Sequence, residues 1–205
     1  MVDGGMLVKE KTFSSVVKKK LEEYCDEVIK SNTSINLISK NTEDNIWNRH
    51  IIDSAQVVDI IPSEFKSFLD IGSGAGFPGI VVKLINSNLD ATLIESNKKK
   101  ARFLKDTTEK IGIDVNIFNK RFEDIEIANN QETVILSRAV SSLGDLLRMG
   151  FKYFELGSIG IFHKGITWEN EVVEAKKRWN FHLTSYESLT NKGSRILLVR
   201  DIIKK

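Results

Sequence analysis

Residues 70–79 include the side chains and glycines of this sequence best suited to hold a small molecule. The segment reads Asp-Ile-Gly-Ser-Gly-Ala-Gly-Phe-Pro-Gly and lies between a short apolar run, predicted as a strand, and a predicted helix. Gly72, Gly74 and Gly76 let the chain turn sharply and let a ligand approach the main chain, and the amides at the helix start point toward that ligand. The segment therefore predicts a ligand-binding loop.

Two classes of ligand fit such a loop, and a structural turn without a ligand is a third interpretation. Gly74, Gly76 and Gly79 match the dinucleotide pattern G-x-G-x-x-G, and Glu95 follows at the distance of a ribose-binding acid. Asp70 favours another ligand, because a carboxylate at the end of the strand repels a pyrophosphate and attracts a cation. S-adenosylmethionine carries an ammonium and a sulfonium group and offers two ribose hydroxyls to Glu95. We therefore expect S-adenosylmethionine as the cofactor.

Two further segments contain side chains that could recognise a nucleotide. After the third predicted strand, Phe122 and Glu123 could flank an adenine, or could serve as an apolar anchor and a helix-start acid. The basic run at 98–100 opens a predicted helix, where positive charge opposes the helix dipole. Phosphate binding would explain this run, and a solvated helix face is the alternative.

Composition and residue counts exclude several classes of protein. One cysteine, Cys25, and three histidines without ligand spacing predict neither a disulfide nor a metal site, and Cys25 is expected to be a small buried residue. Thirty basic and 28 acidic residues leave a net charge of +2, so a nucleic-acid surface must come from local clustering. No apolar run reaches the roughly 18 residues of a membrane span, and no secretion signal is seen, so we expect a cytoplasmic protein without a membrane partner.

Strand and helix patterns alternate after Pro62. Apolar runs predict strands at 68–71, 91–94, 115–118, 133–136 and 159–162, with helices between them at 79–86, 98–111, 143–154 and 168–178. This alternation predicts the α/β class with a doubly wound, Rossmann-like parallel sheet. The last two predicted strands, 181–189 and 195–202, have no helix between them, which predicts an antiparallel pair at one edge.

Helical patterns precede the predicted sheet. The spacing over residues 8–29 predicts an amphipathic helix, and a second helix is expected from Thr42, whose hydroxyl could cap it, to about Ile60. We expect residues 6–62 to form a helical N-terminal extension of one α/β domain, residues 63–205. Residues 1–5 have no apolar periodicity and are expected to be a leader outside the fold.

Several segments together match one known family. They are residues 36–39, 49–54, 70–79, 93–96, 99–104, 137–139 and 164–165. On these segments the sequence resembles the glucose-inhibited division protein B family of RsmG-type methyltransferases, and the likeness extends over most of the chain. The continuation Phe77-Pro78-Gly79, joined to 49–54 and 137–139, makes the likeness specific. One departure is Ser31, which stands before Asn32 where the family usually has a tryptophan.

The resemblance implies a class I methyltransferase that transfers a methyl group from S-adenosylmethionine to N7 of a guanine in small-subunit (16S) ribosomal RNA. It implies cofactor contacts at Gly72 and Phe77, contacts near the adenine at Phe122 and Glu123, and a catalytic role for Arg138 beside cofactor and substrate. The RNA-facing positive residues that it implies are Lys99, Lys100, Arg121 and Lys164. The expected partner is ribosomal RNA or a ribosomal particle, and the protein is expected to be a monomer.

Methylation of guanine N7 makes modest chemical demands. N7 has an in-plane lone pair and no proton, so alignment of the reactants matters more than a general base. Arg138 could present its guanidinium to guanine O6 or to a phosphate, or could instead form a salt bridge with an acid such as Asp145. His50 and Asp53 are expected to form a structural pair that orders the helices against the loop. The alternative functions are a small-molecule methyltransferase and a catalytically silent RNA-binding assembly factor.

Overall fold

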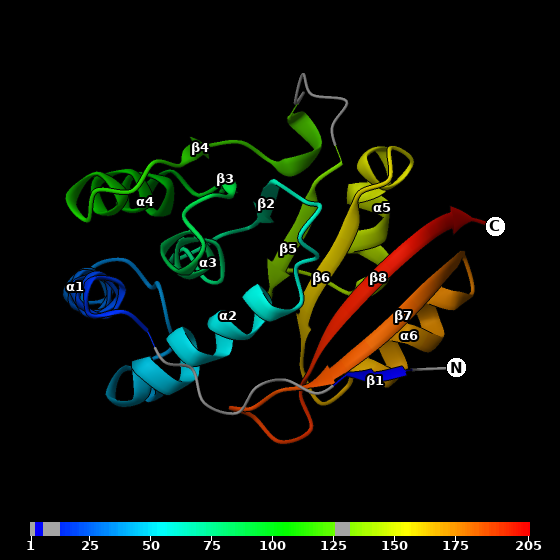
Figure 1. Ribbon diagram of the computed structural model, residues 1–205, viewed down its shortest axis with the longest axis horizontal. Helices are drawn as coiled ribbons and strands as arrows, with labels where there is room; N and C mark the ends of the chain where they lie inside the picture. Colours follow the sequence, from blue (N-terminus) through cyan, green and yellow to red (C-terminus); the bar gives the residue numbers. More distant parts are fainter. Residues whose placement is uncertain (1–2, 6–12, 126–131) are drawn as a thin grey trace.

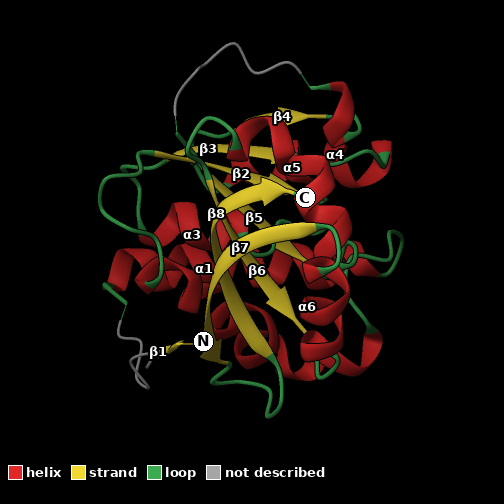
Figure 2. Ribbon diagram, turned by 90° about the vertical axis from the view of Figure 1, so that its right-hand side faces the viewer, coloured by secondary structure: helices red, strands yellow, loops and turns green. Residues whose placement is uncertain are grey.

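The strands of the protein form one twisted sheet (Figure 1, Figure 2). The computed structural model describes residues 3–5, 13–125 and 132–205. Within these residues the sheet has eight strands in the order β1-β7-β8-β6-β5-β2-β3-β4. All neighbouring strands are parallel except that β8 runs antiparallel to β6 and to β7. The predicted doubly wound sheet with an antiparallel pair toward one edge is confirmed.

The strands and helices that follow Pro62 lie close to the predicted ranges. The strands are β1 (Asp3–Gly5), β2 (Ser67–Ile71), β3 (Asp90–Ile94), β4 (Asn116–Phe118), β5 (Val134–Arg138), β6 (Ile159–Lys164), β7 (Trp179–Glu187) and β8 (Arg195–Lys204). The longer helices are α1 (Ser15–Asn32), α3 (Gly79–Ile85), α4 (Lys98–Lys110), α5 (Leu143–Phe154) and α6 (Trp168–Lys176).

Helices cover both faces of the sheet, and the strands contribute side chains to a hydrophobic cluster on each face. In β5, Val134 and Leu136 belong to one cluster, whereas Ile135 between them belongs to the other. Helices α1, α3 and α4 lie on the first face, and α5 and α6 lie on the second (Figure 1). Burial on both faces is the reason that these strands read as continuous apolar runs.

The segment between α1 and β2 is not the single α-helix that the sequence predicts. It forms a 3₁₀ helix (Lys40–Asn45), a π-helix (Trp47–Ile52), the short α2 (Asp53–Ala55) and a second 3₁₀ helix (Gln56–Asp59). Thr42 does not cap a helix, because its hydroxyl donates to the Ser39 carbonyl oxygen at 2.7 Å. The π-helix adds a residue to the turn, a change that the three-and-four pattern does not encode.

The N-terminal end of the chain differs from prediction in two places. Helix α1 begins at Ser15, where Ser14 caps it, whereas the prediction began at residue 8; residues 6–12 lie outside the described part of the chain. Asp3–Gly5 belong to the fold, because they pair in parallel with residues 184–186 of β7. The edge of β7 offers unpaired backbone groups to any extended chain. Because this pairing uses backbone atoms and needs no apolar side chains, hydrophobic periodicity does not predict the strand.

The helical N-terminal residues share a hydrophobic core with the sheet. Tyr24 of α1 and Ile51 are fully buried in the same cluster as Phe68 of β2. The turn after α1 is organised by Asn32, whose exposed fraction is 6%. Its Oδ1 accepts hydrogen bonds from the amides of Leu37 at 2.7 Å and Ile38 at 2.9 Å, and its Nδ2 donates to the Ile38 carbonyl.

Replacement of Asn32 by alanine should destabilise the protein. Asn32→Ala leaves two backbone amides without their acceptor, so the free energy of unfolding should fall by about 2 to 4 kcal/mol. Urea unfolding followed by circular dichroism measures this change. Asn88→Ala, in an exposed turn, is the control and should stay within about 0.5 kcal/mol of the parent protein. Equal stability of both variants would contradict the organising role of Asn32.

Candidate functional site

The glycine-rich loop leaves β2 at the carboxyl edge of the sheet and turns back into α3. Gly72, Gly74 and Gly76 have φ angles of 64°, 59° and 101°, a region in which side chains other than glycine are strained. Gly72 also lies against Val140, where a Cβ atom would come 2.6 Å from a methyl carbon. The loop therefore needs its glycines for conformation and for close approach.

Ser73 and Glu95 connect this loop to the end of β3. The Ser73 hydroxyl donates to the Asp70 carbonyl at 2.9 Å and accepts from the Ile94 amide at 3.2 Å. Glu95, with an exposed fraction of 7%, accepts from the Gly74 amide at 2.8 Å and from the Asn97 amide at 2.7 Å. The acid expected to meet a ribose thus holds the loop through backbone amides.

Asp70 lies fully buried beneath the loop. Its Oδ2 accepts from the Gly79 amide, the first residue of α3, at 3.1 Å, and its Oδ1 has no hydrogen-bond partner among the described residues. Burial raises the pKa of Asp70 to about 7, although the hydrogen bond from the Gly79 amide favours the charged form. A carboxylate with one unpartnered oxygen lowers the cost of bringing a positive charge close to it.

A cavity of about 250 Å³ opens where β2, β3 and β5 end, and we refer to it as the strand-end cavity. Its lining includes Ile71, Gly72, Ile94, Ser96, Lys120, Arg121, Phe122, Glu123, Val140, Ser141 and Met149. Ligands of doubly wound sheets bind in this position, outside the carboxyl ends of the strands. Of the predicted cofactor residues, Gly72, Phe122 and Glu123 line the cavity, whereas Asp70, Gly74, Gly76, Phe77, Glu95 and Arg138 are not part of this lining.

Phe77 occupies a position that the sequence did not predict. Its ring is buried, and it stacks on the His50 ring with centroids 4.9 Å apart, while the Arg138 guanidinium lies 5.0 Å from its centroid. The ring of Phe77 therefore supports two polar side chains, and its expected contact with the cofactor stays a prediction.

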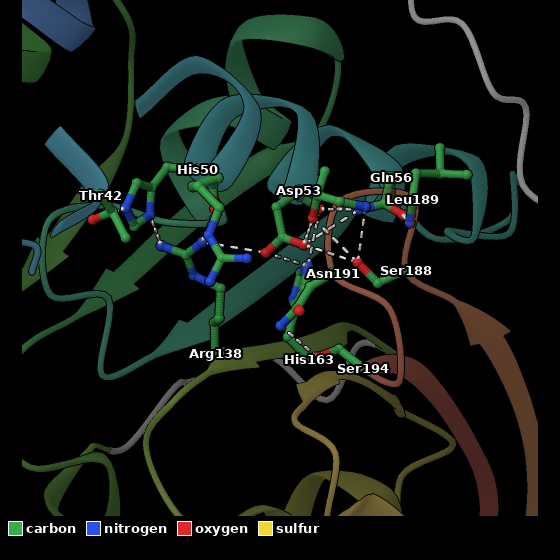
Figure 3. Close-up of polar contacts among 12 residues, drawn as sticks. Thr42, His50, Asp53, Gln56, Arg138, His163, Ser188, Leu189, Asn191 and Ser194 are labelled. Carbon is green, nitrogen blue, oxygen red and sulfur yellow. Dashed lines mark hydrogen bonds and ion pairs between the residues drawn. The ribbon is translucent and has the colours of Figure 1, made fainter. Parts of the chain in front are cut away.

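Arg138, the last residue of β5, is held by a network of polar groups (Figure 3). Nη2 contacts His50 Nδ1 at 2.8 Å, and Nη1 lies 3.3 Å from both Asp53 Oδ2 and the Arg49 carbonyl oxygen. The alternative pairing with Asp145 is wrong, because Asp145 accepts from the hydroxyls of the two serines at 141 and 142 instead. The guanidinium is thus fixed through contacts to the segment at 49–53.

The hydrogen bonds of His50 define its protonation. A guanidinium can only donate, so His50 Nδ1 accepts from Arg138, and Nε2 must carry the proton that it donates to the Thr42 hydroxyl at 2.9 Å. Burial and the positive charge of Arg138 lower the pKa of His50 to about 4. His50 is therefore neutral near pH 7, as this chain of donors requires.

Asp53 is the acceptor at the centre of the network. Burial raises its pKa, but His163, Arg138 and the Thr190 hydroxyl favour the carboxylate, and the net pKa lies below the ordinary value. His163 Nε2 contacts the Asp53 carbonyl oxygen at 3.0 Å. The His50 and Asp53 side chains, which were predicted to pair with each other, are instead both in contact with Arg138, which bridges them.

A second cavity of about 390 Å³ adjoins this network, and we refer to it as the Arg138 cavity. Its walls come from the segment at 49–53, the ends of β5 and β6, and the loop between β7 and β8. Ala139 separates Arg138 from Val140, which lines the strand-end cavity, and it has a φ angle of 56°. This left-handed residue turns the chain between the two cavities, a strained conformation typical of functional sites.

The four predicted RNA-facing residues differ in exposure. Lys99 and Arg121 are exposed and Lys100 is half-buried; Lys99 and Lys100 lie in the first turn of α4, which Asn97 caps. Lys164 differs from the expectation, with an exposed fraction of 6%. Its ammonium lies 2.8 Å from Glu171 Oε2 and donates to the Ser141 carbonyl, because a buried charge needs such partners. Lys164 also lines the cavity beside Arg138, and its contact with RNA stays a prediction.

Among the described residues, no group of three potential ligands is arranged for a metal ion. No helix in this part of the chain is long and apolar enough to cross a membrane. Cys25 is buried as expected, and burial raises the pKa of its thiol to about 12.

Some residues of the network carry no sequence signal. Thr42, His163 and the neighbouring Ser188 and Thr190 come from three separate parts of the chain, and no sequence motif connects them. The matching segment at 49–54 indicated one side of the network, but only the fold brings the other elements to it.

Comparison with known proteins supplies independent information. The family model described as rRNA small subunit methyltransferase G matches residues 17–198. A Ribosomal RNA small subunit methyltransferase G from Ruegeria sp. (strain TM1040) is 36% identical over 181 residues, 86% of this chain and 87% of that protein. The protein of the same name from Rickettsia bellii is 36% identical over 188 residues, 92% of this chain and 95% of the relative.

Solved structures show the same fold at low sequence identity. M. jannaschii TYW2 in complex with AdoMet aligns with a TM-score of 0.55 at 14% identity, over 75% of this chain and 74% of that one. A putative O-methyltransferase from Klebsiella pneumoniae aligns with a TM-score of 0.55 at 13% identity, over 91% of this chain and 90% of that one.

The neutral state of His50 should make the stability of the protein depend on pH. Because the folded-state pKa of about 4 lies below the ordinary value of 6.5, the unfolded chain takes up a proton that the folded protein resists. The stability from neutral His50 is complete above pH 6.5 and is lost as pH falls toward 4. In urea unfolding at pH 7 and pH 5, His50→Gln should lose less stability between the two pH values than the parent protein. His182→Gln, at an exposed position, is the control and should lose as much as the parent; an equal loss in His50→Gln would refute this assignment.

Proposed function

The chain belongs to the rRNA small subunit methyltransferase G family, and we propose that it transfers a methyl group from S-adenosylmethionine to N7 of a guanine in small-subunit (16S) ribosomal RNA. The observation that carries this proposal is the position of Arg138. Its side chain is fixed at the end of β5, and the next residues lead directly from the Arg138 cavity to the strand-end cavity.

The strand-end cavity fits the adenosine end of the cofactor. Phe122 and Glu123 line this cavity and are the proposed contacts of the adenine, and Ile71 and Gly72 line it where the glycine loop begins. The unpartnered Oδ1 of buried Asp70 favours a ligand with positive charge near the loop. The same carboxylate repels the negative charge of a pyrophosphate. When bound, S-adenosylmethionine supplies an electrophilic methyl group on a positively charged sulfur.

Glu95 has a role that follows from its present contacts. Each of its carboxylate oxygens accepts one backbone amide, and each retains a further lone pair for a ribose hydroxyl. Because the same carboxylate holds Gly74, a bound ribose and an ordered loop would stabilise one another.

The Arg138 cavity is the proposed place for the guanine. As the N7–carbon bond forms and the carbon–sulfur bond breaks, the bonding electron pair leaves with sulfur and the positive charge moves to the methylated guanine. No proton is transferred at N7, so the task of Arg138 is to orient the base through O6 or a phosphate without occupying the N7 lone pair. His50 and Asp53 suit this task because they fix the direction of the guanidinium.

Removal of the guanidinium should abolish most of the methyl transfer. Arg138→Ala is expected to lower kcat/KM by about 100-fold or more, because the base loses its alignment. Small-subunit RNA incubated with the protein and isotopically labelled S-adenosylmethionine is mapped by mass spectrometry. Arg148→Ala on the exposed face of α5 is the control and should methylate normally. Label at a position other than guanine N7, or equal transfer to isolated nucleosides, would argue for another substrate.

The first turn of α4 should bind phosphates of the RNA. Lys99→Gln combined with Lys100→Gln should weaken RNA binding and reduce the slope of log K against log salt by about 1.5, while S-adenosylmethionine binding is retained. Lys176→Gln combined with Lys177→Gln, in the last turn of α6 and just beyond it, removes the same charge and serves as the control. Filter binding at several salt concentrations measures the slope, and equal slopes in the two variants would remove this role from α4.

A further inference from the structure

The two carboxylate oxygens of Asp53 face two different parts of the Arg138 cavity. Oδ2 lies 3.3 Å from Arg138 Nη1, whereas Oδ1 accepts from the Thr190 hydroxyl at 2.7 Å and the Ser188 hydroxyl at 3.3 Å (Figure 3). We propose that Asp53 is a positioning residue that holds Arg138 and the β7–β8 loop as two walls of one acceptor pocket. This inference rests on the proposed methyl transfer.

The β7–β8 loop is fastened to the helical segment at more than one point. Besides the Asp53 contacts, the Gln56 side-chain oxygen accepts from the Leu189 amide at 2.8 Å. Gln56 is fully buried, and its amide nitrogen donates to the Asp53 carbonyl oxygen at 3.0 Å. The loop is therefore held by side chains of one short stretch of chain, residues 53–56.

This loop presents polar groups to the cavity in front of Arg138. Asn191, Ser194 and Arg195 line the cavity on that side. The Arg195 guanidinium lies 5.8 Å from the ring centroid of Trp168, and one of its nitrogens contacts Glu187 at 3.5 Å. A hydroxyl, an amide and a guanidinium suit the ribose and phosphate of a nucleotide, so the loop is the proposed wall that contacts the sugar-phosphate portion of the acceptor.

Stability alone does not account for a charged pair in this place. The side chains of Asp53 and Arg138 have exposed fractions of 15% and 17%, so both charges have lost most of their water. The desolvation cost of such a pair can exceed its attraction, and a buried pair is therefore weak support for a stabilising role. The Asp53 carboxylate instead fixes the orientation of its neighbours, because one oxygen contacts Arg138 and the other accepts from the hydroxyls of the β7–β8 loop.

The two connections can be broken one at a time. Asp53→Asn can keep an oxygen toward Thr190 but presents an NH₂ group to the Arg138 guanidinium, which can only donate. We expect kcat to fall by about 10- to 100-fold while the affinity for S-adenosylmethionine is retained. Thr190→Val keeps the carboxylate beside Arg138 and removes the shortest contact to the loop. This variant should raise KM for the RNA several-fold and largely retain kcat.

A spectroscopic signal distinguishes positioning from a general loss of structure. The ¹⁵N resonance of His50 Nδ1 reports the hydrogen bond from Arg138, so it should move in Asp53→Asn and stay in place in Thr190→Val. Asp90→Asn, at the opposite end of the strands, is the control and should leave kcat, both KM values and the His50 resonance unchanged. Should Asp53→Asn fail to fold, Thr190→Val decides the question through KM for the RNA.

The outcomes separate this inference from the proposed function. If the parent protein does not methylate guanine N7, the proposed function itself is wrong. If the parent is active but Asp53→Asn retains kcat, or Thr190→Val retains KM for the RNA, the positioning role of Asp53 is overturned. A lower kcat in Asp53→Asn with a displaced His50 resonance, together with a raised KM in Thr190→Val, supports it.

Discussion

This site depends on one constraint: the guanidinium of Arg138 has lost most of its water and must still be held in one direction. Arg138 satisfies it with the Phe77 ring on one side, a neutral histidine at one nitrogen and a carboxylate at another. Each partner has a requirement of its own: His50 must carry its proton on Nε2, and Asp53 must remain ionised. The irregular helical segment at 40–59 supplies both partners, and its π-helix sets where they point.

The glycine loop and the Arg138 network are parts of one arrangement. Phe77 belongs to the loop, yet its ring packs against His50 and Tyr24, and the Tyr24 hydroxyl donates to the Ala75 carbonyl at 2.7 Å. Loop, helix α1 and the segment at 40–59 therefore share one hydrophobic core with the sheet. In the proposed enzyme, this shared packing keeps donor and acceptor cavities in a fixed relation, as in-line transfer of a methyl group requires.

Several predictions from the sequence concerned local chemistry, and those agree well with the structure. Strands β2 to β8, the helices α3 to α6 and the glycines with positive φ angles follow from patterns within about ten residues of chain. The burial of Phe77 and Lys164 was not predicted, because orientation toward a cavity or toward the core is decided by neighbours from other elements. For the same reason, the sequence suggested Asp145 as a partner of Arg138, although the partner is Asp53 from a segment 85 residues away.

Hydrophobic periodicity, glycine placement and the matching segments determined the fold class, the position of the ligand loop and the family of this chain. Those features are encoded by short stretches of sequence, since strand and helix periods and positive φ angles depend on the residues themselves. Tertiary structure alone decided that Asp53 joins Arg138 to the β7–β8 loop, that His50 is neutral, and that Asp3–Gly5 complete the sheet edge. These outcomes depend on burial and on contacts between distant residues, and no local pattern specifies which polar atoms lose their water together.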